Sequence, residues 1–515
     1  MAEDRQVLTT EERAMSALSW TMATRLWHEW TIPNRATPAK LARSAALSVL
    51  VEDLGRLAEG PAPLHRQLAR ALAGAIERGR LARGERLPAE RILAPAVAVS
   101  RGTVVAGYDL LVADGLVERR RGSGTYVLGP GALGLPSGRE GSALVHRLVD
   151  RSAGRSGLID LSISVLSDST GLPEVQVGTA DLAAVVPDTG YSPWGIGVLR
   201  QVLADHVTGW GLPTSAEEVV ITTGAQQAIS AAAACWVRPG DEVVVEDPTY
   251  PGAVAAFAQA GARLVGVRVD GGGAVVEELH RALARRPALV YLQSRVQSPT
   301  GVHLAAHRRA ELADLLTAAR VPVVEDLALA DLAWTEPPPP LAAAMPAGSV
   351  AVVGSLSKLL WGGLRLGFVR ASPSLALRFA RVKATHDLGS SVVSQLLAHR
   401  MLTEVEPREV ARRRQTQLRR RYDTLAAGLG RQLPDWTWDP PTGGLSIWVR
   451  LPAPDAEAFA RLALHHRVAV ATSAPLSAGG RHPDRLRLSF APPEPELDTA
   501  VSRLAAAWAE LRAGL

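Results

Sequence analysis

The stretch Ser355-Leu356-Ser357-Lys358, followed by Gly363-Leu364-Arg365-Leu366-Gly367, decides how the rest of the chain is interpreted. It sets a primary amine among hydroxyl side chains, with an arginine and glycine-rich backbone close behind. Hydroxyls, guanidinium groups and exposed backbone amides are the groups that hold phosphates and other anions. The stretch therefore predicts an anion pocket built around the amine of Lys358.

Lysine is otherwise almost absent from the chain. Of 56 basic residues, only Lys40, Lys358 and Lys383 are lysine. A primary amine can condense with an aldehyde, whereas a guanidinium stays protonated and cannot. A chain that relies so heavily on arginine is expected to keep lysine where arginine cannot serve. An amine beside an anion pocket points to pyridoxal 5'-phosphate, held as an aldimine on Lys358, which is the expected catalytic residue.

Length and composition indicate a soluble multidomain protein. The chain has 515 residues, of which 47% are hydrophobic and 21% charged, and at roughly 150 residues a domain it has room for about three domains. Residues 1–13 are polar, and no apolar run reaches the roughly 20 residues of a membrane helix. We expect a cytoplasmic protein with no membrane contact and no metal site. The single Cys235 predicts a buried small hydrophobe and excludes an internal disulfide.

Positive charge is concentrated near the N-terminus. Residues 61–127 hold 11 arginines and six acids, so their net charge is 11 − 6 = +5, which equals the formal net charge of the whole chain. A basic excess confined to one small module is typical of a nucleic-acid contact surface. We therefore expect double-stranded DNA as a partner of this module.

Hydrophobic spacing in this module predicts three helices and a hairpin. Leu64, Leu68, Leu72 and Ile76 recur every fourth residue and predict one helix, a second begins at about Ala89, and Ser100 is the expected N-cap of a third. Residues 116–127 alternate around a glycine turn, as in a β-hairpin. The inward face of the third helix is predicted to carry Val104, Tyr108 and Leu111. Together these elements predict a winged helix-turn-helix at residues 49–128, after an N-terminal extension at 1–48.

The remainder of the chain predicts an α/β fold. Residues 129–157 are rich in Gly, Pro, Ser and Arg, which predicts a flexible linker. Residues 158–515 then alternate buried-strand signals with helical stretches, the pattern of a large, mostly parallel sheet, and residues from about 400 to 515 predict a smaller C-terminal α/β subdomain. The predicted strands include 219–221, 243–245, 264–267, 289–292, 321–324, 351–353, 445–449 and 486–490.

The N-terminal motifs resemble the GntR-type winged helix. The matching segments are Leu87-Pro88-Ala89-Glu90-Arg91, Val99-Ser100-Arg101-Gly102-Thr103-Val104 and the run from Gly115 to Val127. A helix N-terminus bearing short polar side chains suits contacts with phosphates and base edges. With the resemblance, this implies DNA contacts from Arg91, Ser100, Arg101, Thr103 and Gly122. Gly102 and Val105 depart from the family pattern and leave fewer base contacts on that helix.

Residues 158–515 resemble a fold-type I aminotransferase, and the resemblance implies a role for each part of the site. Gly224, Ala225 and Gln226 follow a predicted strand and, with Ser355, Ser357 and Arg365, are the implied phosphate ligands. Tyr250 is the implied ring that stacks on the cofactor, and Asp326 the implied partner of its pyridine nitrogen. Arg487 is the implied ligand of an effector's carboxylate, with Arg485 as a neighbouring alternative. Tyr191 lies in a loop that in this family approaches the partner subunit's cofactor.

Two departures from the aminotransferase pattern bear on chemistry. Ser298, which we expect to bind the cofactor, stands where asparagine is usual, and the segment Asp326-Leu327-Ala328 lacks the tyrosine that commonly tunes the pKa of the imine. The groups that bind the aldehyde are therefore retained, whereas those that adjust the pKa of the imine are replaced or missing. This difference favours sensing over turnover.

The domain order resembles the MocR/GabR family of bacterial transcriptional regulators. This resemblance implies a homodimer and a DNA-binding regulator that senses pyridoxal 5'-phosphate or a small amino compound through an aldimine at Lys358. Two alternatives stay open. One is an active pyridoxal-phosphate-dependent aminotransferase (a transaminase) that carries a DNA-binding domain, and the other is a domain that has lost the cofactor and is kept for dimerisation.

Overall fold

The computed structural model describes residues 63–77, 81, 84–97, 99–113, 116–120, 123–128, 157–166, 172–185, 189–452 and 455–513. The expected extension at 1–48 lies outside the described residues, as does the expected linker at 129–157 except for Gly157. The chain divides into two compact units, Met1–Ser137 and Gly138–Leu515, here called the N-terminal and C-terminal units.

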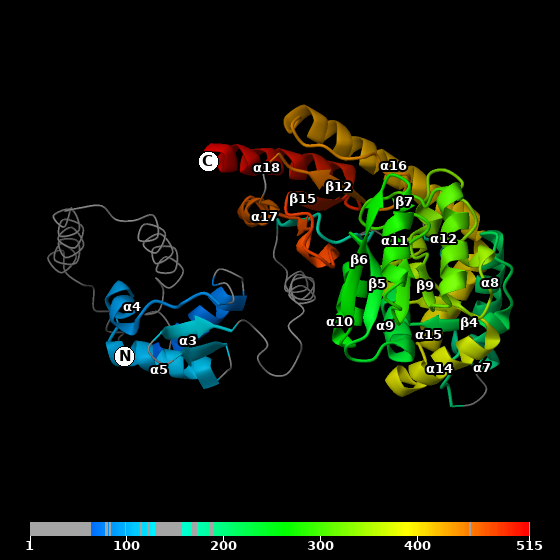
Figure 1. The fold of residues 1–515 in the computed structure, drawn as a ribbon, viewed down its shortest axis with the longest axis horizontal. Helices are drawn as coiled ribbons and strands as arrows, with labels where there is room; N and C mark the ends of the chain where they lie inside the picture. The colour runs from blue at the N-terminus through cyan, green and yellow to red at the C-terminus, as the bar shows by residue number, and fades with distance from the viewer. Residues whose placement is uncertain are drawn as a thin grey trace, which may run out of the picture. The chain divides into compact units, whose positions relative to one another are not determined.

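The described residues of the N-terminal unit form three helices and a hairpin, as predicted. Its elements are α3 (Leu64–Glu77), α4 (Glu90–Ala96), α5 (Arg101–Ala113), β1 (Val117–Arg120) and β2 (Gly124–Val127), and the two strands pair antiparallel (Figure 1). The core prediction for α5 is confirmed, because Val104, Tyr108 and Leu111 are buried. The helix predicted from the apolar series is confirmed as α3; Leu64 is 43% exposed because it begins the helix, whereas the later members of the series are buried.

An eight-stranded sheet forms the body of the C-terminal unit. In spatial order its strands are β4 (Val219–Thr222), β11 (Gly367–Arg370), β10 (Val350–Ser355), β9 (Val323–Asp326), β8 (Leu289–Leu292), β5 (Glu242–Asp247), β6 (Arg263–Asp270) and β7 (Gly273–Ala274). The strands from β10 to β6 pair parallel, whereas β11 pairs antiparallel with both of its neighbours. The predicted mostly parallel sheet is therefore confirmed.

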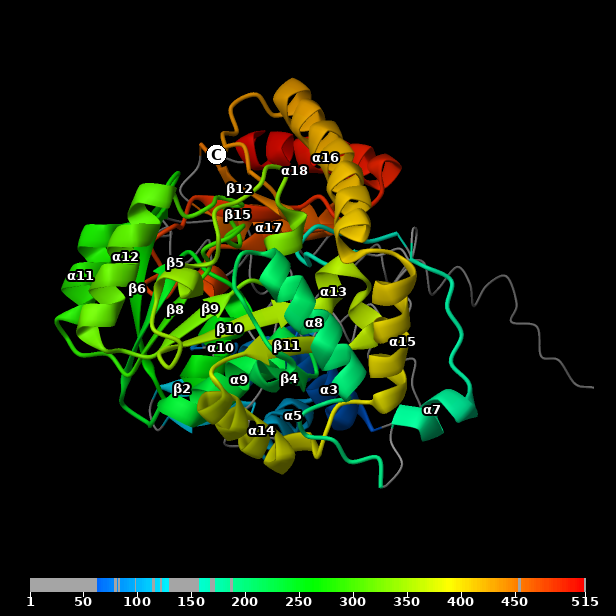
Figure 2. The ribbon, with the colours of Figure 1, turned by 90° about the vertical axis from the view of Figure 1, so that its right-hand side faces the viewer.

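Helices cover both faces of this sheet (Figure 2). On one face, α9 (Ala225–Trp236), α10 (Pro251–Gln259) and α14 (Pro373–Asp387) pack in one apolar cluster, which includes the buried Cys235. The opposite cluster is formed by α8 (Gly197–Gly209), α11 (Val276–Leu283), α12 (Ala306–Ala319) and α15 (Val392–Glu404), with α7 (Thr179–Val185) beside α15. Because neither face meets water, the central strands are continuous apolar runs.

The smaller subdomain follows the long helix α16 (Pro407–Gln432). It contains β12 (Ser446–Arg450), α17 (Ala456–His465), β13 (Val468–Ala469), β14 (Ala471–Thr472), β15 (Arg485–Ser489) and α18 (Glu494–Ala513). A three-stranded sheet has the order β12-β15-β14. The short strand β3 (Ile159–Asp160) pairs parallel with β13, so the first segment of this unit closes onto its last part. No helix among the described residues is long and apolar enough to cross a membrane.

Three aromatic rings fix α17 and α18 in this subdomain. Phe459 is fully buried, and its ring centroid lies 5.2 Å from that of Trp436 and 5.6 Å from that of Trp508, both edge-on. Leu464, on the same helix, is 50% exposed.

We predict that Phe459→Ala lowers the free energy of unfolding by about 3–5 kcal/mol, because it removes a buried ring and leaves a cavity. Chemical denaturation followed by tryptophan fluorescence measures the change. The control Leu464→Ala removes an exposed side chain and should change the free energy by less than about 0.5 kcal/mol. Similar losses in the two variants would contradict this assignment of the core.

Candidate functional site

The carboxyl ends of neighbouring strands bring the candidate residues together. Val353 in β10 pairs with Asp326, the last residue of β9. The chain then leaves β10 at Ser355 and enters the short helix α13 (Leu356–Leu359), which carries Lys358. This edge of an open α/β sheet is where such folds place their ligands. The amine of Lys358 and the carboxylate of Asp326 therefore approach one site from adjacent strands.

Lys358 has an amine that is unusually easy to deprotonate. Its Nζ donates a hydrogen bond of 2.6 Å to the carbonyl oxygen of Ser164. Burial, followed by the charge of Arg487, lowers the pKa of Lys358 to about 8, and Arg365 adds to this effect while Asp326 opposes it. At pH 7 roughly a tenth of the amine is therefore neutral, against well under a thousandth for an ordinary lysine. A neutral amine is the form that attacks an aldehyde.

Asp326 is a buried carboxylate held by two donors. The phenol of Tyr291 donates to its Oδ2, and the amide of Ala328 donates to its Oδ1 at 2.8 Å. Burial raises the pKa of Asp326, whereas the hydrogen bond from Tyr291 lowers it, as do the amide and Lys358. A cationic group placed against this carboxylate would favour its ionised form.

A tight anion cradle lies at the start of α9. Gly224 precedes the helix with a φ of +87°, which favours glycine. Gly367 passes so close that a Cβ there would lie 2.7 Å from the carbonyl carbon of Gly224 and 2.8 Å from the amide nitrogen of Ala225. Arg365 donates to the carbonyl oxygen of Thr223 at 3.2 Å. This approach sets a guanidinium beside the free amides of a helix N-terminus, which suits a phosphate.

The two predicted serines line the same turn of chain as Lys358. Ser355 caps α13, because its Oγ accepts a hydrogen bond of 3.2 Å from the amide of Ser357. Both side chains are buried. Their hydroxyls precede the amine by three residues and by one residue, so they sit where the chain leaves β10.

Tyr250 and Gln226 are packed around a glycine. Gln226 Nε2 donates to the carbonyl oxygen of Gly252 at 2.9 Å, and a Cβ at Gly252 would lie 2.4 Å from Cε1 of Tyr250. Burial raises the pKa of Tyr250, and so does Asp326, while Arg487 and Arg365 lower it. The phenol therefore shares its surroundings with both arginines and with the carboxylate of Asp326.

Arg487 and Ser298 have different surroundings. Arg487 is buried on β15, and its Nη2 donates to the carbonyl oxygen of Ser162. Its neighbour Arg485 instead lies among Asp484, Arg450 and Asp439. Ser298 is buried, and its amide donates to Gln293 Oε1 at 3.1 Å. Within the described residues, no hydrogen bond joins Ser298 to Lys358 or Asp326.

The donor set fits pyridoxal 5'-phosphate. The cradle at Gly224–Ala225 and Arg365 matches a phosphate, Asp326 matches a ring nitrogen, and the amine of Lys358 matches an aldehyde. Gln226 Oε1 is buried and has no hydrogen-bond partner among the described residues, so the site has polar capacity that its own side chains leave unused.

Two contributors to the site were missed by sequence reasoning. Ser164 acts through its backbone carbonyl, which any residue type could supply, so its side chain gave no signal. Tyr291 belongs to no recognisable motif and lies within the buried apolar strand β8. In the sequence it therefore could not be distinguished from an aromatic residue of the core. Only its pairing with Asp326 in space separates it from the core.

The N-terminal unit presents its candidate DNA contacts at the start of α5. Arg101 is the first residue of this helix and is exposed, as is Arg91 on α4. The expected N-cap is confirmed, because Ser100 Oγ accepts a hydrogen bond of 3.0 Å from the amide of Thr103, and the two hydroxyls lie 2.8 Å apart. Gly122 lies outside the described residues.

Part of the positive charge on the hairpin formed by β1 and β2 is already paired. Arg119 forms an ion pair of 2.7 Å with Asp109 on α5, and Arg120 pairs with Glu118 at 2.6 Å. Arg120 also lies over the ring of Tyr126, 4.5 Å from its centroid. Arg91 and Arg101 are thus the better candidates for phosphate and base contacts.

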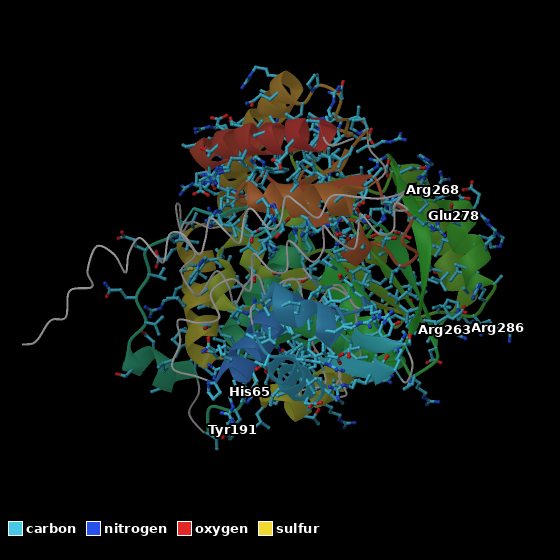
Figure 3. All side chains as sticks on the ribbon, turned by 90° about the vertical axis from the view of Figure 1, so that its left-hand side faces the viewer. His65, Tyr191, Arg263, Arg268, Glu278 and Arg286 are labelled. Carbon is cyan, nitrogen blue, oxygen red and sulfur yellow. The ribbon has the colours of Figure 1, made fainter. Side chains whose placement is uncertain are left out.

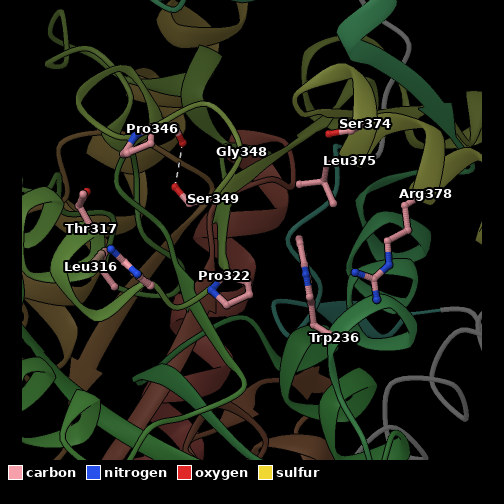
Figure 4. Close-up of a pocket in the computed structure, with 11 residues that line it drawn as sticks. Trp236, Leu316, Thr317, Pro322, Pro346, Gly348, Ser349, Ser374, Leu375 and Arg378 are labelled. Atoms are coloured by element: carbon pink, nitrogen blue, oxygen red, sulfur yellow. Dashed lines mark hydrogen bonds between the residues drawn. The ribbon is translucent and has the colours of Figure 1, made fainter.

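A surface cavity of 530 Å³ lies away from these groups (Figure 4). It opens beside Trp236, Ser349 and Arg378, close to the residues that lead into β9 and β10. Lys358 and Asp326 lie at the other ends of those strands. Within the described part of the chain, no group of three or more His, Cys, Asp or Glu residues is arranged to hold a metal ion.

Comparisons with known proteins agree with this geometry. The family model for aminotransferase class I and II matches residues 156–504, and that for bacterial regulatory proteins of the gntR family matches residues 64–127. The HTH-type transcriptional regulators YisV and YdfD of Bacillus subtilis (strain 168) are 30% and 27% identical to this chain. The YisV match covers 75% of this chain and 84% of YisV, and the YdfD match covers 76% and 84%.

A solved structure shares the fold of the C-terminal unit. It is LysN, an α-aminoadipate aminotransferase from Thermus thermophilus, complexed with N-(5'-phosphopyridoxyl)-L-leucine. The sequences are 28% identical, the TM-score is 0.64, and the match covers 72% of this chain and 95% of LysN.

We predict that the amine of Lys358 reacts with acetic anhydride with a midpoint near pH 8, because its pKa is lowered to about 8. Arg487→Met should move this midpoint to higher pH, since it removes a cation that disfavours the protonated amine. Arg485→Met, on the same strand, should leave it unchanged. Mass spectrometry of labelled peptides over a pH series measures the midpoint. A midpoint that ignores Arg487 would contradict the proposed electrostatic coupling.

Proposed function

The chain belongs to the MocR/GabR type of transcriptional regulators, in which a gntR-family domain precedes an aminotransferase class I and II domain, and we propose that pyridoxal 5'-phosphate bound on Lys358 changes its affinity for DNA. One observation carries this proposal. An amine with a lowered pKa lies with a buried carboxylate, two arginines and an anion cradle at the carboxyl ends of the strands.

Each residue of the site has a task in this function. Bound pyridoxal 5'-phosphate supplies an aldehyde and an electron-accepting ring. Lys358 presents a neutral amine at the end of β10, and Arg365 with the start of α9 holds the phosphate. Asp326, oriented by Tyr291, would hold a proton on the ring nitrogen. Arg487, buried beside this group, would pair with the carboxylate of an amino-compound effector.

The response to an effector follows from binding to two states. An amino compound that displaces Lys358 would leave the lysine as a free amine and place its own carboxylate against Arg487, so the charges around Lys358 would differ before and after the exchange. A ligand can shift the DNA-binding state only by the difference of its affinities for the two states. The residues that carry this difference are the ones that border Lys358.

We also propose that the chain forms a homodimer through an apolar surface near the site. Tyr191 is 68% exposed (Figure 3), and Leu388 is 51% exposed next to Gly389, whose backbone closely approaches Ser192. Trp361, three residues after Lys358, is 44% exposed. Exposed aromatic and aliphatic side chains of this size are typical of an interface with another subunit.

A working aminotransferase is the second candidate, because a buried arginine beside Lys358 equally suits an amino-acid substrate. Steady turnover of an amino donor with a keto acid, lost in Lys358→Ala, would favour the enzyme. A single exchange without continued product would favour the sensor.

We predict that borohydride reduction after incubation with pyridoxal 5'-phosphate attaches a pyridoxyl group to Lys358. Lys358→Arg keeps the charge but cannot condense with an aldehyde, so it should yield no adduct at this position and no visible absorbance of the imine. Peptide mass spectrometry identifies the modified residue. A wild-type protein with no adduct on Lys358 would overturn the proposed function.

We predict that Arg101→Ala weakens binding to the chain's own upstream DNA by roughly 1–3 kcal/mol if the side chain contacts a base. Affinity should also fall steeply with salt, since phosphate contacts release counterions. Titrations by fluorescence anisotropy measure both effects. Arg263→Ala, an exposed arginine of the C-terminal unit, is the control. Equal affinity of Arg101→Ala and wild type would remove α5 as the recognition helix.

A further inference from the structure

The lysine at position 383 is buried, whereas most arginines of the described residues are exposed. It lies on α14 with 1% of its side chain exposed. Its Nζ donates to both carboxylate oxygens of Asp387 at 2.7 Å and to Gln227 Oε1 at 3.2 Å. These three acceptors match the three donors of an ammonium group. A longer, planar guanidinium with five donors would not match them.

The Lys383–Asp387 pair is not needed merely to fill the core. Burial lowers the pKa of Lys383, and an apolar side chain of similar size could replace a buried ion pair at no loss of stability. A lysine in this place is therefore better explained by what the pair holds.

The pair holds Thr223 both directly and through Gln227. Asp387 Oδ2 accepts a hydrogen bond of 2.8 Å from Gln227 Nε2 and one of 3.1 Å from Thr223 Oγ1. Gln227 Oε1, which also accepts from Lys383, accepts from the amide of Thr223 at 2.8 Å. Both the amide and the hydroxyl of Thr223 are thus fixed by the network around Lys383.

Thr223 is the residue at which this network meets the anion cradle. It directly precedes Gly224 and Ala225, whose backbone opens α9, and its carbonyl accepts the hydrogen bond from Arg365. A shift of Thr223 would move the helix amides and the guanidinium relative to each other. Both must face the same anion for the cradle to work.

We propose that Lys383 is a positioning residue for the phosphate of the cofactor: with Asp387 and Gln227 it fixes Thr223, so that the start of α9 and Arg365 converge on one phosphate. This inference rests on the proposed function, because it takes pyridoxal 5'-phosphate as the ligand. It assigns Lys383 no contact with the cofactor and no part in the reaction at Lys358.

The test compares pyridoxal 5'-phosphate with pyridoxal, which carries the same aldehyde and ring but no phosphate. Dissociation constants for both are measured from the visible absorbance of the adduct. Lys383→Met should raise the dissociation constant for pyridoxal 5'-phosphate at least about tenfold, as expected when a hydrogen-bonded charged group is lost from a buried network. It should leave the affinity for pyridoxal within about twofold.

Two further variants keep the test decisive. Arg381→Met, an exposed position on the same helix, should change neither affinity. Asp387→Asn keeps the shape of the side chain but removes the charge that Lys383, Gln227 and Thr223 share, and should give the same selective loss even if Lys383→Met fails to fold. Melting temperatures identify a variant that does not fold.

The outcomes separate this inference from the proposed function. If wild type forms no adduct with either compound, the proposed function fails. Suppose that wild type forms the adduct, but Lys383→Met and Asp387→Asn keep its preference for pyridoxal 5'-phosphate or lose affinity for both compounds equally. The positioning role of Lys383 is then overturned. A loss confined to the phosphorylated compound supports it.

Discussion

The site depends on one electrostatic constraint: the partly buried amine of Lys358 is influenced by two guanidinium groups. Burial and the charges of Arg487 and Arg365 all disfavour the ammonium form of Lys358, and Asp326 is the carboxylate that opposes them. Such crowding of positive charge is relieved by anions, or by converting the amine into a neutral group. A ligand with an aldehyde, a phosphate and, after exchange, a carboxylate meets each of these demands.

The sheet makes this crowding possible by its strand order. β11 lies antiparallel between β4 and β10, so the chain that leaves Lys358 returns beside the start of α9. The glycine at 367 allows the backbones to touch there, and any side chain would push the cradle apart. Backbone contact, rather than a long side chain, thus determines where the phosphate groups of a ligand can lie.

Sequence reasoning predicted the parts of the fold that rest on local patterns. Continuous apolar runs predicted the central strands, and the hairpin and helices of the N-terminal unit followed from spacing and caps. It missed β11, whose Gly367–Arg370 segment is short and follows a glycine-rich turn, and the pairing of β3 with β13, which joins segments about 300 residues apart. No local pattern contains such pairings, because both partners must be known before either is recognisable.

The same limit explains what was found and missed in the site. Lys358 stands out by residue type, and Asp326 and Arg487 were identified through the resemblance to aminotransferases. The carbonyl of Ser164 and the phenol of Tyr291 matter only through their neighbours in space. The lysine at 383 shows both sides of this limit. Its rarity was visible in the sequence, but its link to Thr223 required the fold.

Asp387 joins the cradle to the exposed surface of the C-terminal unit. Besides Lys383, Gln227 and Thr223, it accepts a hydrogen bond of 3.0 Å from the amide of Gly389, which follows the exposed Leu388 and lies against Ser192 beside Tyr191. The carboxylate that helps to fix Thr223 at the cradle is therefore the one that also holds this surface loop. Because the two share one carboxylate, a shift of Thr223 at the cradle would disturb the same group that holds Gly389, on the surface proposed above for the homodimer.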